Sequence, residues 1–260
     1  MNRDEFLKAV QEDPYQIENA DEAFKKDKEI VLIAVSQNAN TLEYAHSSLK
    51  KDKDVVLAAI KEGAHAIAFA DDTLKKDKNI MLTAIKDNGD SLEHAHSSLK
   101  KDKDVVLAAI KSSGSAIEYA DASFQKDKEI VLIAVSTSAE ALNYADASLK
   151  KDKEVVKASL KQNGYSLQYA DESLKKDKEI VSMAVQSNGN ALRFADASLQ
   201  NNKEIVMLAV NKTGRALEYV DKSLTKDKEV VMAAVKQDSE ALEYADKSLK
   251  KDKDIVKAAK

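Results

Sequence analysis

The chain has 260 residues, of which 33% are charged and 43% are hydrophobic, and its formal net charge at pH 7 is −4. This balance of charge, together with only three arginines, argues against a strongly basic protein that binds nucleic acids. The absence of cysteine excludes a disulfide framework and thiolate chemistry.

The sequence also lacks the usual signals for membranes and secretion. No apolar run approaches the ~20 residues that a membrane-spanning helix requires. The start, MNRDEFLKAV, has no basic region followed by an apolar run, as a signal peptide would. We therefore expect no membrane association, and a protein that is cytoplasmic or secreted without a classical signal peptide.

A 25-residue repeat runs through the whole chain. The motif KKDK begins at Lys25, Lys50, Lys75, Lys100, Lys150, Lys175 and Lys250, and variants of it begin at Gln125, Gln200 and Thr225. Because no insertion or composition shift interrupts the period, we predict a single domain over residues 1–260. The repeats are expected to start near residues 2, 27, 52, 77, 102, 127, 152, 177, 202 and 227, with a last helix at 252–260.

Each repeat is predicted to begin with a helix, which we call helix A. An aspartate precedes it and can accept hydrogen bonds from the free amides of the first turn. Such caps are expected at Asp27, Asp52, Asp77, Asp102, Asp127, Asp152, Asp177, Asp227 and Asp252. After Asp27, apolar residues follow at helical spacing, namely Ile30, Val31, Ala34 and Val35. Helix A is apolar nearly all round, so we expect it to be buried.

A turn and a second helix should complete the repeat. Helix A ends near pairs such as Asn88-Gly89, where we expect the glycine to adopt the left-handed conformation. A second helix then carries Leu42, Ala45 and Leu49 at i, i+3 and i+7. Each helix has about ten residues, fewer than the ~12–15 at which an isolated helix is marginal in water. The repeats should therefore be stable only when stacked.

The first repeat differs from the others in a way that indicates a direction of stacking. Four positions that are apolar in later repeats are polar in it, namely Glu5, Lys8, Gln16 and Asn19. They pair at i, i+3 on the two predicted helices. We interpret them as a polar capping face that replaces contacts with a preceding repeat.

These observations predict an all-α solenoid of ten helix–turn–helix repeats and a final single helix, and by analogy a right-handed superhelix. The pattern L-x-Y-A-D-x-S-L-K-K-D-K-E-I-V-x-x-A-V at residues 167–185 resembles the repeats of the domain of unknown function 4116 (DUF4116). That family is found largely in bacteria and protists, and its unit spans about two of the present repeats.

The resemblance implies the architecture and supplies no activity and no catalytic residue. Some members of the family occur in secreted effectors of intracellular bacteria, so an effector-like role in a bacterium stays open. The regularity of the sequence leaves a second origin open, because an engineered consensus array without biological function would have it too.

Two sets of residues are the best candidates for a partner surface. We call residues at the same place in successive repeats a column. The leucine column includes Leu32, Leu57, Leu82, Leu107 and Leu132. If it is partly exposed, it forms an apolar stripe for a partner; alternatively, the second helix of the same repeat covers it. The aromatic column includes Tyr119, Tyr144 and Tyr169, whose rings either contact a partner or pack between repeats. The first repeat has Asn19 instead of a ring in this column, and it has no preceding repeat to pack against, which favours the packing interpretation.

Other columns have structural explanations that we prefer. The aspartate column, with Asp71 as an example and histidine at His46 and His96, is a cation site or a local turn that closes the second helix. The lysines between repeats, such as Lys50 and Lys51, form a lysine edge that either binds a polyanion or keeps the array in solution. A metal site is not expected, because His94 and His96 diverge on a helix.

No catalytic constellation is recognisable. The glycines are single turn residues, and the carboxylates lie in periodic columns rather than in one cluster. We therefore expect a monomeric, non-enzymatic scaffold with no cofactor and no metal, which binds a protein partner. The alternative is binding of nucleic acid or another polyanion along the lysine edge.

Overall fold

The computed structural model describes residues 2–259, and every regular element in that range is helical. The all-α repeat architecture is therefore confirmed. The chain divides into two compact units, with the boundary between Phe124 and Gln125. The single domain and the handedness of the superhelix stay predictions, and residues 1 and 260 lie outside the described range.

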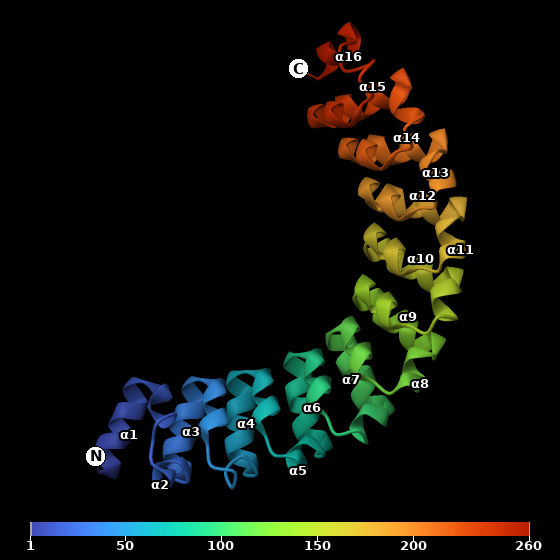
Figure 1. The fold of residues 1–260 in the computed structure, drawn as a ribbon. Coiled ribbons are helices and arrows are strands. Elements are labelled where there is room, and N and C mark those ends of the chain that lie inside the picture. The colour runs from blue at the N-terminus through green and yellow to red at the C-terminus, as the bar shows by residue number, and fades with distance from the viewer. Residues whose placement is uncertain (1, 260) are drawn as a thin grey trace. The chain divides into compact units, whose positions relative to one another are not determined.

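Each unit is a stack of the predicted 25-residue repeats (Figure 1). Helix A of the first unit is α1 (Arg3–Glu12), α3 (Lys28–Gln37), α4 (Lys53–Glu62), α6 (Lys78–Asp87) and α7 (Lys103–Ser112). In the second unit it is α9 (Lys128–Thr137), α10 (Lys153–Gln162), α12 (Lys178–Ser187), α14 (Lys203–Lys212), α15 (Lys228–Gln237) and the shorter α16 (Lys253–Ala258).

A 3₁₀ segment follows helix A in each repeat. These segments are η1 (Pro14–Ile17), η2 (Ala39–Tyr44), η3 (Ala64–Phe69), η4 (Gly89–His94) and η6 (Gly114–Tyr119) in the first unit. In the second unit they are η7 (Ala139–Tyr144), η9 (Gly164–Tyr169), η10 (Gly189–Phe194), η11 (Gly214–Tyr219) and η13 (Ser239–Tyr244).

A short helical turn then leads to the next repeat. It is an α-helical turn at α2 (Glu22–Lys25), α5 (Asp72–Lys75), α8 (Ala122–Gln125), α11 (Glu172–Lys175) and α13 (Ala197–Gln200). It is a 3₁₀ turn at η5 (Leu99–Lys101), η8 (Leu149–Lys151) and η12 (Leu224–Lys226).

The second helix of each repeat is therefore not the continuous helix that the sequence predicts. Leu42, Ala45 and Leu49 are all buried, as their spacing requires. Ala45, however, has an extended backbone (φ −62°, ψ 146°) and ends η2. The cause is the residue that follows, because an aspartate or histidine side chain there accepts the amide two residues on and starts a separate turn.

The glycines after helix A have a different role from the predicted one. None of the described residues has a positive φ, so no left-handed conformation is needed. A Cβ on Gly189 would lie 2.3 Å from the carbonyl oxygen of Ala209 in the next repeat, and one on Gly89 would lie 2.4 Å from that of Ala109. Glycine here permits close approach of two backbones.

Aspartate side chains cap helix A in the way that the sequence indicates. The Asp52 carboxylate accepts the amides of Asp54 (3.0 Å) and Val55 (3.2 Å). The same arrangement occurs at the other cap aspartates. Asn202 takes this place before α14 and accepts only the Ile205 amide, at 3.2 Å. Carboxylates therefore satisfy the first-turn amides that would otherwise lack partners.

The core of each unit lies between helix A and the 3₁₀ segments. In α3 the side chains of Ile30, Val31, Ala34 and Val35 are completely buried. Helix A contacts helix A of the following repeat, and successive 3₁₀ segments also contact one another. The opposite side of helix A, which includes Ser36, remains exposed, so helix A is not buried all round.

A backbone hydrogen bond also joins each repeat to the next. The Asp171 amide donates to the Lys150 carbonyl (3.0 Å), and the Asp71 amide donates to the Lys50 carbonyl (3.0 Å). The donor follows the acceptor by 21 residues in each repeat pair where it is described. Side-chain packing and main-chain bonding thus connect the same neighbours.

Exchanging aspartate and asparagine at the capping positions 102 and 202 should change the stability of the array in opposite directions. Asp102 accepts hydrogen bonds from the Asp104 and Val105 amides and pairs with Lys78 at 2.9 Å, whereas the cap Asn202 is neutral. Asp102→Asn should lower the midpoint of thermal unfolding and Asn202→Asp should raise it. Asp102→Ala, which removes the cap itself, should cost more, about 1–2 kcal/mol. Shifts of the same sign for Asp102→Asn and Asn202→Asp would contradict the role given to the carboxylate.

Acid should destabilise the array in a defined pH window. The Lys78 ammonium lowers the pKa of Asp102, and the Lys153 ammonium lowers that of Asp177. The carboxyl groups of the unfolded chain have a higher pKa, ~3.9, so in acid the unfolded chain binds more protons than the folded chain. The free energy of unfolding should therefore fall as the pH drops from about 5 to 3. Burial lowers the pKa of His94, which adds a smaller loss nearer pH 6.

Urea unfolding at a series of pH values measures this effect. The denaturation midpoint should decrease steeply below pH 5, and Asp102→Asn should reduce that decrease. An unchanged midpoint between pH 7 and pH 3 would contradict the account.

Candidate interaction surfaces

The exposed side of helix A carries the leucine column. Leu32, Leu82, Leu107 and Leu132 are half-buried, and Leu57 is 36% exposed. The 3₁₀ segment of the same repeat therefore leaves these side chains partly accessible. Later repeats place Lys157, Ser182, Met207 and Met232 in the same column, all partly exposed. We call this side of the helices the groove face.

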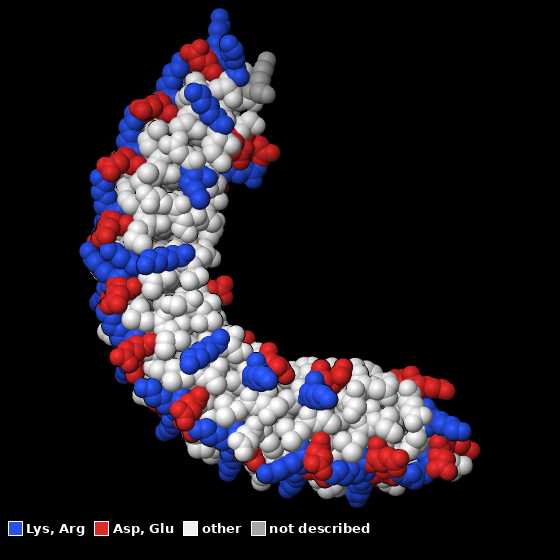
Figure 2. All heavy atoms as spheres, turned by 180° about the vertical axis from the view of Figure 1, so that it is seen from behind, with Lys and Arg blue, Asp and Glu red and all other residues white. Residues whose placement is uncertain are grey.

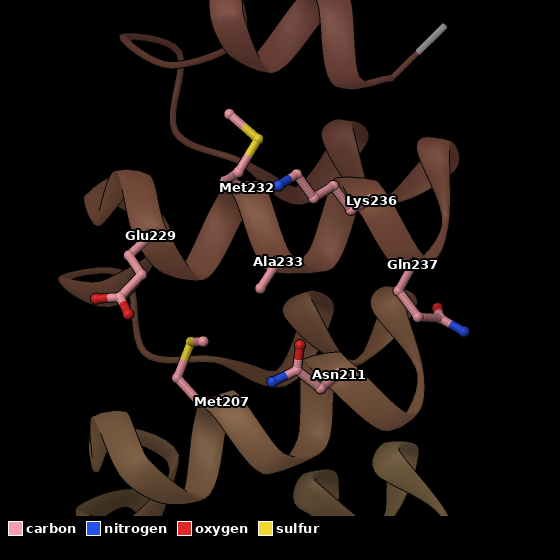
Figure 3. Close-up of a pocket in the computed structure, with 7 residues that line it drawn as sticks. All are labelled: Met207, Asn211, Glu229, Met232, Ala233, Lys236 and Gln237. Atoms are coloured by element: carbon pink, nitrogen blue, oxygen red, sulfur yellow. The ribbon is translucent and has the colours of Figure 1, made fainter.

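Successive A helices enclose shallow grooves on this face. One groove of about 490 Å³ lies between α9 and α10 and is lined by Leu132, Lys157, Ala158 and Lys161, among others. Another, of about 410 Å³, lies between α14 and α15. In Figure 3 Met207 and Asn211 of α14 point toward α15, and Ala233 points back toward them. The first unit has a more polar groove between α3 and α4, lined by Ser36, Ala58, Lys61 and Glu62.

Basic side chains stand at one end of these grooves. Lys161 and Lys236 lie in the last turns of α10 and α15, are exposed, and form no ion pair with any described residue. At the other end the acidic groups are already paired, since Glu154 binds Lys128 (2.7 Å) and Glu229 binds Lys203 (2.6 Å). Each of these two grooves therefore combines half-buried apolar side chains with an unpaired ammonium group.

The aromatic column lies at the ends of the 3₁₀ segments. Tyr119, Tyr144 and Tyr169 are half-buried, and burial raises the pKa of the Tyr119 hydroxyl. Tyr44 meets the ring of Tyr15 edge to face, with centroids 6.3 Å apart. Among the described residues, no groove on the groove face includes a ring of this column. The leucine and tyrosine candidates are thus not brought into one site.

The side chains of the aspartate column form hydrogen bonds within local turns. The Asp171 carboxylate accepts the Ser173 amide (3.0 Å) and hydroxyl (2.7 Å), which lowers the pKa of Asp171. His46 replaces the carboxylate with its ring, because Nδ1 lies 3.2 Å from the Ser48 amide and 2.8 Å from its hydroxyl. These contacts match the turn interpretation. Residues 2–259 contain no group of three or more acidic or histidine side chains suited to a metal.

In the KKDK motif that begins at Lys50, each lysine has its own partner in the array. Lys50 donates to the carbonyl of Glu43 near the end of η2 (2.6 Å). Lys51 lies 3.8 Å from the Asp71 carboxylate. Lys53 binds the cap of the next helix, Asp77, at 2.7 Å. Figure 2 shows basic and acidic side chains alternating along this edge within each unit. Exposed pairs of this kind contribute little stability each, but they neutralise the lysine edge.

The capping face predicted for the first repeat is exposed. Glu5, Lys8, Gln16 and Asn19 all lie at the surface. Gln16 and Asn19 border a hollow of about 240 Å³ above Phe6. Phe6 stacks on Phe24 with ring centroids 4.4 Å apart and is nearly buried. This aromatic pair covers the core where later repeats have aliphatic contacts.

Sequence reasoning overlooked a cluster in the second unit that breaks the repeat. Arg193 stands where most repeats have glutamate, and Tyr165 shares its column with only one other tyrosine, Tyr15 of the first repeat. The Arg193 guanidinium lies 5.1 Å from the centre of the Phe194 ring and 5.6 Å from that of Tyr219. Tyr165 meets Phe194 edge to face at 5.8 Å. The signal in the sequence was the departure of neighbouring repeats from their own columns.

Comparisons with known proteins place the chain in a family. A model described as domain of unknown function (DUF4116) matches residues 2–50, 35–75, 52–100, 77–125, 102–150, 127–175, 152–199, 177–225 and 227–259. No curated protein and no solved structure matches the chain. Within residues 2–259, no helix has the length and apolar character to cross a membrane. Because the matches tile nearly all of the sequence, the chain belongs to the DUF4116 repeat family.

Proposed function

We propose that the protein is a non-enzymatic repeat scaffold that binds protein segments along the groove face. The observation that carries this proposal is the recurrence of one groove between successive A helices. It recurs between α3 and α4, between α9 and α10, and from α14 to α16. Recurrence suits an elongated partner rather than a small molecule, which a single enclosed cavity would favour.

The lining of the grooves indicates what kind of segment would bind. Leu132, Met207 and Met232 offer partly exposed apolar surface, and methionine adapts its shape to different partners. Lys161 and Lys236 offer unpaired charges beside it. A segment with apolar side chains and nearby carboxylates would match both features.

The spacing of the grooves restricts the partner further. If stacked helices lie ~10 Å apart, an α-helical partner rising 1.5 Å per residue would meet a new groove about every seven residues. Apolar side chains repeating at about two helical turns would then fill successive grooves. Such a helix on a row of apolar grooves is a common mode of recognition.

The lysine edge gives less support to binding of nucleic acid. A polyanion requires several cations that are free to release counterions. Lys53, Lys78 and Lys153 instead bind the cap aspartates of the next repeat. We therefore do not adopt polyanion binding as the proposed function.

Substitutions in one groove test the proposal. The double substitution Met207→Lys and Met232→Lys introduces charge into the leucine column, where the array already has Lys157 and Lys257. The variant should therefore still fold. Partner capture from cells of the source organism, measured by quantitative crosslinking mass spectrometry, should fall at least tenfold, about 1.4 kcal/mol. Asn143→Lys, on a 3₁₀ segment, is the matched control and should change nothing. Equal capture by both variants would refute the groove face as the binding surface.

A further inference from the structure

The arginine cluster of the second unit, formed by Tyr165, Arg193, Phe194 and Tyr219, has features of a binding site. Arg193 lies in η10, between Tyr165 of η9 and Tyr219 of η11. Its side chain is exposed, whereas the three rings are half-buried. The guanidinium is held over two rings, at 5.1 Å and 5.6 Å from their centres. Stacking of this kind fixes the plane of the guanidinium and reduces the entropy lost on binding.

No carboxylate among the described residues pairs with the Arg193 guanidinium. Arg193 forms no ion pair or side-chain hydrogen bond with a described residue. Arg3 and Arg215, the other arginines, both bind carboxylates, since Arg3 pairs with Asp27 and Arg215 pairs with Glu240. The hydrogen-bond donors of the stacked guanidinium are therefore available to a ligand.

Neighbouring columns change together with Arg193. The residues that precede it in its column within the second unit are the neutral Asn143 and Gln168. In the repeat that contains Lys50, for example, the lysine side chain donates to the main-chain carbonyl of Glu43, which lies in the same column as Arg193. Beside Arg193 that lysine is replaced by Gln200, whose amide reaches the Leu192 carbonyl at 3.2 Å and the Arg193 carbonyl at 3.4 Å. The replacement keeps the main-chain contact and removes a like charge from the neighbourhood of Arg193.

We propose that Arg193, held between the rings of Phe194 and Tyr219, binds a carboxylate side chain of an acidic protein segment. A planar guanidinium binds a carboxylate through two parallel hydrogen bonds. The parts of the half-buried rings that Arg193 does not cover provide apolar surface for the residues that flank this carboxylate. The site lies on the 3₁₀ segments and shares no residue with the grooves between A helices, so it is independent of the proposed function.

A single-stranded nucleic acid fits this cluster less well. Its phosphates would need several unpaired cations in a row, and Arg215 is engaged by Asp238 and Glu240. Bases would need free ring faces, but Arg193 covers the Phe194 ring and Tyr165 meets it edge to face. A single guanidinium matches one carboxylate, which can accept both of its parallel hydrogen bonds.

The small number of arginines allows a direct test on the full chain. In ¹⁵N-labelled protein, Arg3, Arg193 and Arg215 give the three arginine Nε–Hε signals, which single substitutions assign. The probes are the peptides acetyl-Phe-Glu-Phe-amide and acetyl-Phe-Gln-Phe-amide, and inorganic phosphate. The glutamate peptide, at about millimolar concentration, should shift the Arg193 signal in a saturable way. The signals of Arg3 and Arg215 should not move.

Two variants make the test specific. Arg193→Lys keeps the charge but loses the planar fork and should weaken binding of the glutamate peptide at least fivefold. Because this variant lacks the Arg193 side-chain signal, binding to it and to the parent chain is compared through the backbone amide signal of Phe194. Glu218→Gln removes the acidic residue that follows Arg193 in its column, and should tighten that binding. Circular dichroism should be unchanged for both variants, because Arg193 and Glu218 are exposed.

Three results would overturn the proposal. The first is an Arg193 signal that the glutamate peptide does not move. The second is an equal response to the glutamine peptide, which would mean that the carboxylate is not recognised. The third is saturation by phosphate at a lower concentration than by the glutamate peptide, which would assign the site to phosphoryl groups.

Discussion

Every other feature of the array depends on the shortness of its helices. A complete helix A has ten residues, too few for a stable isolated helix, and the 3₁₀ segments are shorter still. Stability must then come from contacts with neighbouring repeats. Those contacts are of three kinds: packing of buried aliphatic side chains, the hydrogen bond from the Asp171 amide to the Lys150 carbonyl and its equivalents, and pairs such as Lys153–Asp177.

This dependence explains why so much of the polar sequence is periodic. Asp77 caps its own helix and accepts the Lys53 ammonium of the preceding repeat. Asp171 closes a turn with its side chain and joins two repeats with its amide. Each such residue satisfies a local and an inter-repeat requirement together. Both surfaces that we propose for a partner, the lysine ends of the grooves and Arg193, carry charged groups that form no ion pair with a described residue.

The sequence predicted the repeat and the buried residues well, because both follow from periodicity alone. Ile30, Val31 and Leu42 are buried as their spacing indicates. It did not predict the break in the second helix, since residues at i, i+3 and i+7 are buried equally by one helix or by two short turns. The break depends on a side-chain hydrogen bond at His46 or Asp71. The role of Gly189 depends on a carbonyl in the next repeat, which a single repeat does not reveal.

The candidate sites also divide into features that periodicity predicts and features that only the structure shows. Periodicity located the leucine column but could not say how far the 3₁₀ segment would cover it. The arginine cluster joins two departures from the period, Arg193 and Tyr165, to two rings of the aromatic column, and only the structure shows that they meet. In a repeat protein, residues that break a column are therefore as informative as the column itself.

The most direct test of this account is the stability of fragments that differ in the number of repeats. Fragments of one, three and five repeats, each starting at residue 127, can be unfolded by heat and followed by circular dichroism. A single repeat should be unfolded, and the unfolding midpoint should rise with each added repeat, because stability comes from interfaces between neighbours. A single 25-residue repeat that is helical and melts cooperatively would contradict the account.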